Sequence, residues 1–129
     1  MTHEVAAKTA VLVLSDPEGG DEALGRVFNA LAAAYDFDRA GNEVRVQFHG
    51  AGTRWPELLS APDHPAYEVY QAVRHTVAGA SCGCADVFGS SEGVRDSGIE
   101  LIKDNPLPGT SGLASLRALV DDGYRILSF

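Results

Sequence analysis

The chain has 129 residues, of which 18 are acidic and 10 are basic, so its formal net charge is −8 at pH 7. This length suits one domain that buries its own core, and we expect a single domain at residues 9–129 after a polar leader at residues 1–8. The negative charge argues against nucleic acid and anionic membrane surfaces as partners, because both would repel the protein.

The sequence has features of a cytoplasmic protein. No apolar stretch reaches the length of a transmembrane helix, and the leader lacks the pattern of a signal peptide. We therefore expect no membrane partner, and in a reducing compartment both cysteines should be free thiols. A disulfide between Cys82 and Cys84 is less favoured, because it would close a very small ring and distort the backbone.

The N-terminal part of the domain predicts a buried strand followed by a long helix. Residues 9–14 (TAVLVL) form a continuous apolar run, which is typical of a central strand in a parallel sheet. A loop at residues 15–20 follows. From residue 21 to about residue 40 apolar side chains recur at helical spacing, with Asp21 as the expected cap and Gly41 as the expected end.

The next strand is expected at residues 43–49 (EVRVQFH), where apolar and polar residues alternate strictly. Its polar face carries Arg45, Gln47 and His49. A buried Arg45 would need a partner, so we expect this face near a sheet edge or against another subunit. The pattern therefore indicates a homo-oligomer.

Shorter elements fill the rest of the chain. The residue pattern predicts helices at 54–60 and 63–79, a strand at 80–82, helical turns at 84–88 and 91–97, a strand at 99–102, a loop at 103–112, a helix from 113 to about 123 and a strand at 124–129.

Strands and helices alternate along the chain, which predicts an α/β fold with three layers (α/β/α). We expect about five mostly parallel strands with helices on both faces and right-handed crossovers, as in flavodoxin-like proteins. Ligands of such sheets bind at the carboxyl ends of the strands. Those ends carry four segments, Ser15 to Gly20, His49 to Thr53, Cys82 to Cys84 and Lys103 to Gly112.

The two cysteines are the candidate catalytic residues. A thiolate is a better nucleophile than a thiol, and free backbone N–H groups at the start of a helix stabilise it. Cys84 is expected where a helical turn begins, and Gly83 would allow a sharp bend before it. Asp86 acts in the opposite sense. The alternative is that both cysteines are small buried residues with a packing role.

Other classes of site fit the sequence less well. The possible zinc ligands lack the usual spacings, so we expect no metal; they are Cys82, Cys84, His49, His64 and His75. The loop at residues 15–20 is crowded with acidic residues and has no phosphate-binding motif, so we expect no cofactor. The candidate substrate-binding residues at the strand ends are Ser15, Asp16, His49 and Gly83.

The chain resembles the DsrE/DsrF family of small sulfur-handling proteins. The resemblance lies in VLVLSDPEGGDEALGRVFNAL, EVRVQFHGAGT, SCGCADVFG and SLRALVDDGYRILSF, and it covers nearly the whole chain. It implies a three-layer parallel α/β domain that assembles as a dimer, trimer or hexamer. It also implies a cysteine near the carboxyl edge of the sheet that carries sulfur as a persulfide. Both Cys82 and Cys84 fit the family pattern.

Two functional hypotheses follow. The first is a sulfur carrier or sulfurtransferase-like protein, in which Cys84 or Cys82 accepts a sulfane sulfur and passes it to a partner thiol. Its partners would be a sulfur donor and a sulfur acceptor protein. The alternative is a non-catalytic, oligomeric module that binds a small molecule or a partner at the same strand ends, so enzymatic activity is left open.

Overall fold

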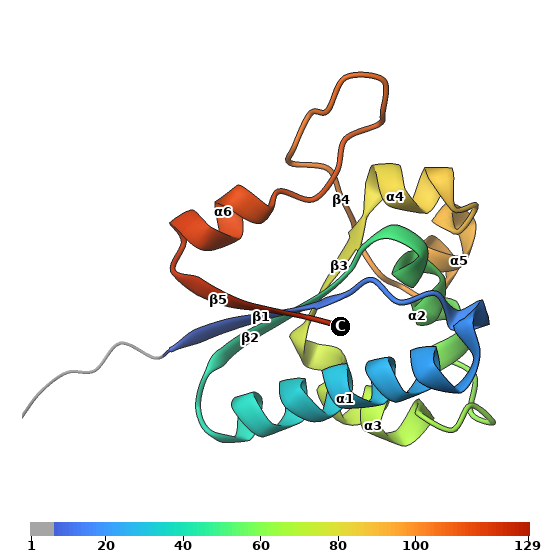
Figure 1. The fold of residues 1–129 in the computed structure, drawn as a ribbon, viewed down its shortest axis with the longest axis vertical. Helices are drawn as coiled ribbons and strands as arrows, with labels where there is room; N and C mark the ends of the chain where they lie inside the picture. Colours follow the sequence, from blue (N-terminus) through green and yellow to red (C-terminus); the bar gives the residue numbers. More distant parts are fainter. Residues whose placement is uncertain (1–6) are drawn as a thin grey trace, which may run out of the picture.

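Five parallel strands lie at the centre of the computed structural model, which describes residues 7–129 (Figure 1). The strands are β1 (Lys8–Val13), β2 (Glu43–Phe48), β3 (Val77–Ser81), β4 (Leu101–Ile102) and β5 (Tyr124–Ser128). Their order across the sheet is β4-β3-β2-β1-β5. This order differs from the 2-1-3-4-5 order of flavodoxin.

Helices connect the strands. The α-helices are α1 (Gly20–Arg39), α2 (Trp55–Leu59), α3 (Tyr67–Val73), α4 (Cys82–Val87), α5 (Ser91–Asp96) and α6 (Leu116–Asp121). Short 3₁₀ helices are η1 (Pro17–Gly19), η2 (Gly50–Arg54) and η3 (Arg74–Thr76). The expected α/β class, with parallel strands and helices on both faces, is confirmed.

The strand order explains which helices cover which face. β1 to β4 follow one another across the sheet, so right-handed crossovers put α1 to α5 on one face. β5 lies on the other side of β1, so its crossover helix α6 covers the opposite face. Figure 1 shows α1 and α3 on one side of the strands and α6 on the other.

The two faces of the sheet carry cores of different size. In β1, Val11 and Val13 point into a large core with residues of α1 to α5. Ala10 and Leu12 point the other way, into a small cluster with Leu119 of α6 and residues of β5. β1 is therefore buried on both faces, which is why its sequence reads as one apolar run.

Several predicted boundaries differ from the structure. Lys8, expected in the polar leader, begins β1; residues 1–6 of that leader lie outside the described residues. Asp21 lies in the first turn of α1 rather than at its cap, which is Gly19. The helix expected at residues 63–79 is wrong at both ends, because α3 covers only Tyr67–Val73 and β3 already begins at Val77.

The expected edge position of β2 is wrong. β2 pairs with β1 on one side and with β3 on the other. Its polar side chains lie on the face of the sheet that α6 covers, where Gln47 and His49 are buried and hydrogen-bonded to each other. The Arg45 guanidinium lies 6.0 Å from the centroid of the Tyr124 ring. The polar face thus finds partners within the chain, and contact with another subunit stays a prediction.

Candidate functional site

The carboxyl ends of the strands meet at one edge of the sheet, as a parallel sheet requires. The loop after β1, η2 after β2, α4 after β3 and the long loop between β4 and α6 all start there (Figure 1). The segments expected at this edge therefore lie there. Their side chains, however, form several separate groups.

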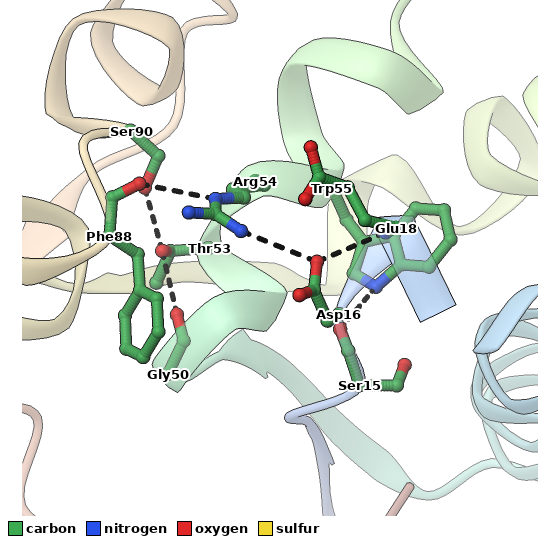
Figure 2. A network of polar contacts seen from close by, with 9 residues as sticks. All are labelled: Ser15, Asp16, Glu18, Gly50, Thr53, Arg54, Trp55, Phe88 and Ser90. Atoms are coloured by element: carbon green, nitrogen blue, oxygen red, sulfur yellow. Dashed lines mark hydrogen bonds and ion pairs between the residues drawn. The ribbon is translucent and has the colours of Figure 1, made fainter. Parts of the chain in front are cut away.

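Arg54 links three of these segments (Figure 2). Its Nη1 lies 3.4 Å from Oδ1 of Asp16, in the loop after β1. Its Nε donates a hydrogen bond of 3.1 Å to the carbonyl of Phe88, at the end of α4, and its guanidinium lies 5.5 Å from the centroid of the Phe88 ring. The Arg54 side chain thus holds the loop after β1 and the end of α4 in place.

Hydrogen bonds and a close backbone approach fix η2 at the same edge. The indole nitrogen of Trp55 donates to the carbonyl of Ser15 at 2.8 Å, and the hydroxyls of Thr53 and Ser90 lie 2.7 Å apart (Figure 2). A Cβ atom at Gly52 would lie 2.2 Å from the carbonyl oxygen of Val13. Only glycine therefore lets η2 lie directly on the end of β1.

The cysteine segment differs from the prediction in where its helix begins. α4 starts at Cys82, directly after β3, so Cys84 is the third residue of the helix and not its first. Gly83 is a helical residue in a buried position rather than a bend before Cys84. Its N–H donates to the carbonyl of Gly112 at 2.7 Å, and a Cβ atom there would lie 2.6 Å from Cδ1 of Leu113. Gly83 thus allows the loop before α6 to pack against α4.

The two thiols have different surroundings. Cys82 is 9% exposed, whereas Cys84 is half-buried. The sulfur of Cys82 lies 3.4 Å from the hydroxyl of Ser111, and this hydroxyl donates to Oδ2 of Asp86. The other carboxylate oxygen of Asp86 accepts a hydrogen bond of 2.6 Å from the hydroxyl of Ser91. These hydrogen bonds, that from Ser111 first, lower the pKa of Asp86.

His49 follows β2 and is 8% exposed. Its Nε2 lies 2.9 Å from Oε1 of Gln47, and burial lowers the pKa of its imidazole. The ring lines a cavity of about 380 Å³ between the start of α6 and the loop before it. Asp104 lines the same cavity, and its Oδ1 accepts a hydrogen bond of 2.7 Å from the N–H of Ser115.

The four candidate substrate-binding residues do not share one cavity. Ser15 and Asp16 line a cavity of about 210 Å³ beside the start of α1. Gly83 lines a second one of about 330 Å³, between α4 and Gly109 to Ser111. His49 lines the third, beside α6. The expectation that ligands bind at the carboxyl ends of strands thus places these residues at one edge of the sheet, but it does not tell which of them share a cavity.

The other two histidines within residues 7–129 have local roles. His64 accepts a hydrogen bond of 3.0 Å from the N–H of Ala66, near the start of α3, and His75 lies 2.9 Å from a carboxylate oxygen of Asp38. Within residues 7–129, no group of three or more His, Cys, Asp or Glu side chains is arranged to hold a metal ion. Among the helices of this part of the chain, none combines the length and apolar character that crossing a membrane requires.

Sequence reasoning missed Arg54 and Ser111. Arg54 was expected only as the start of a short helix, and Ser111 has no motif around it. Each contacts a residue that is far away in the sequence. Arg54 pairs with Asp16 across 38 residues, and Ser111 contacts Cys82 across 29 residues. No local pattern reports such contacts, so only the fold reveals them.

Comparison with protein-family models, with curated proteins and with solved structures finds no match to this chain.

Proposed function

We propose that this protein is a sulfur carrier in which Cys84 accepts and passes on a sulfane sulfur. The observation that supports the choice is the exposure of Cys84, which is half-buried and lies in the first turn of α4 at the carboxyl edge of the sheet. A donor must bring its sulfur into contact with the accepting thiolate, and Cys82 is 9% exposed. The resemblance of SCGCADVFG to the DsrE/DsrF pattern supports the same chemistry.

The proposed transfer is a thiol exchange without net oxidation or reduction. The Cys84 thiolate attacks the outer sulfur of a donor persulfide, R–S–SH. The donor S–S bond breaks and R–S⁻ leaves, while a new S–S bond forms on Cys84. An acceptor thiolate then attacks the outer sulfur of the Cys84 persulfide in the same way, which regenerates the Cys84 thiolate.

Intact mass spectrometry after treatment with a small persulfide donor tests the proposal. We expect wild type and Cys82→Ser to gain the mass of one sulfur atom, and Cys84→Ser to gain none. A reductant should remove the added sulfur. If wild type gains no sulfur, the protein is not a sulfur carrier. If Cys84→Ser still gains it and Cys82→Ser does not, the carrier residue is Cys82.

The second candidate is a non-catalytic binding module, and the cavity beside α6 favours it. That cavity, of about 380 Å³, brings the His49 ring and the Asp104 carboxylate together. Polar side chains of Asn105, Ser115 and Arg117 line it as well, beside apolar ones such as Leu113 and Leu116, and converging polar groups in a concave site are what orient a small molecule. Alkylation in native buffer separates the two candidates, because thiols with only a packing role react after denaturation and not before.

A further inference from the structure

The hydrogen bonds around Cys82 indicate which of the two groups, its thiol or the Ser111 hydroxyl, donates the proton in their contact. A serine hydroxyl has one proton, and that of Ser111 is donated to Oδ2 of Asp86. Ser111 therefore presents a lone pair to the sulfur of Cys82, 3.4 Å away. For this contact to be a hydrogen bond, the Cys82 thiol must be the donor and must keep its proton.

Ionisation of Cys82 would disrupt this arrangement. A Cys82 thiolate would need the Ser111 proton, which would have to turn away from the Asp86 carboxylate. Hydrogen bonds to a carboxylate are among the stronger ones in proteins, and Asp86 is held as a carboxylate by both Ser111 and Ser91. Two anions would thus compete for one hydroxyl proton.

One backbone donor beside the sulfur is already engaged. The N–H of Gly83, the residue next to Cys82, already donates to the carbonyl of Gly112 at 2.7 Å. The charged groups near this network come from three segments. Asp86 lies on α4 itself, Arg95 of α5 favours the Asp86 carboxylate, and Lys103 packs against Gly112 in the loop before α6.

We propose that Asp86, acting through Ser111, holds Cys82 as a thiol and so leaves Cys84 as the nucleophile. This inference rests on the proposed sulfur-carrier function for its biological meaning. The effect on Cys82 itself does not depend on it. Asp86 and Ser111 are positioning residues here, because neither needs to touch the transferred sulfur.

Alkylation of Cys82 by iodoacetamide tests the inference without any sulfur transfer. In a Cys84→Ser background, the rate at Cys82 is followed over a range of pH for three further variants, Asp86→Asn, Ser111→Thr and Glu92→Gln. In Asp86→Asn the amide can donate to the Ser111 oxygen, which frees the Ser111 proton for the sulfur. We expect Cys82 to react about tenfold faster at neutral pH than in the Cys84→Ser background, with the gain largest at the lower end of the pH range.

Two variants serve as controls. Ser111→Thr keeps the hydroxyl and should keep the pH profile of the background protein. Glu92→Gln removes the same charge from an exposed position in the first turn of α5 and should change the rate little. Equal rates in Asp86→Asn and Glu92→Gln would overturn the inference, as would a Cys82 that reacts in every variant only after denaturation. Neither result affects the persulfidation of Cys84, so the two proposals fail separately.

Discussion

At the scale of single residues, His49 shows how burial changes what a residue can do. It was expected at a strand end among candidate substrate-binding residues, and it is 8% exposed with its Nε2 beside Gln47. Burial disfavours the imidazolium, so the pKa of His49 is lowered from its ordinary value of 6.5. At neutral pH the ring is a neutral acceptor or donor rather than a cation.

This lowered pKa predicts a pH dependence of stability. Below pH 6.5 the unfolded chain binds a proton at His49, while the folded protein does not until the pH falls further. The unfolded state then binds more protons, so the free energy of unfolding decreases as the pH falls through this window. Urea unfolding of wild type and His49→Gln at several pH values measures the effect. The free energy of unfolding of wild type, measured relative to that of His49→Gln, should fall on acidification. A difference that stays constant with pH would contradict this prediction.

The cysteines also show where residue-level prediction ends. The sequence placed Cys82 and Cys84 at the carboxyl end of a strand, and in the structure they directly follow β3. The assignment of the helix start to Cys84 was wrong, because α4 begins two residues earlier. The contact with Ser111 distinguishes the sulfur of Cys82 from that of Cys84. It joins residues 29 positions apart, so the local sequence does not predict it.

At the scale of elements, long periodic segments were predicted well and short ones poorly. α1 and the apolar β1 were placed within one residue of their observed ends, because each repeats a pattern over many positions. β3 was misread, because Val77 continues the helical spacing of α3 and Gly79 resembles a helix end. In the structure Gly79 lies inside the strand, where a Cβ atom would lie 2.6 Å from the carbonyl oxygen of Glu100.

The contact between η2 and β1 gives a prediction at this scale. A Gly52→Ala methyl would meet the backbone of Val13, which cannot move aside as a side chain can. We expect the free energy of unfolding to fall by about 3 kcal/mol, near the upper end of overpacking effects. The matched control is Gly25→Ala, where nothing lies within 4 Å of the added methyl. That change should raise the stability by about 0.5–1 kcal/mol, since alanine favours a helix.

Chemical denaturation of the two glycine variants measures these changes. Equal stabilities for Gly52→Ala and wild type would mean that η2 is free to shift away from β1. In that case Arg54 and Trp55 would not hold the edge of the sheet as described.

At the scale of the whole molecule, the strand order leaves α6 as the helix that covers the face opposite α1. α6 packs Leu119 inward, while Leu116 and Val120 are 45% and 58% exposed. The two side chains are four residues apart and therefore neighbours on the helix surface, and contiguous exposed apolar groups mark interaction sites. For this reason, and because the sequence resembles an oligomeric family, we predict that the protein is a homo-oligomer.

Light scattering coupled to size-exclusion chromatography measures the oligomeric state. We expect a mass of two or more 13.6 kDa chains, and a shift to the monomer in a Leu116→Glu, Val120→Glu variant. Glu43→Gln, an exposed change at the start of β2, serves as a control and should leave the mass unchanged. A wild-type protein that runs as a monomer at all concentrations would refute the prediction.

Above all, we propose that the half-buried thiol of Cys84 takes up sulfur at the carboxyl edge of this sheet. Its most direct test is peptide-resolved mass spectrometry of the wild-type protein after a brief exposure to a persulfide donor in native buffer. We expect one added sulfur atom on Cys84 and an unmodified Cys82. Two unmodified cysteines, with uptake only after denaturation, would contradict it.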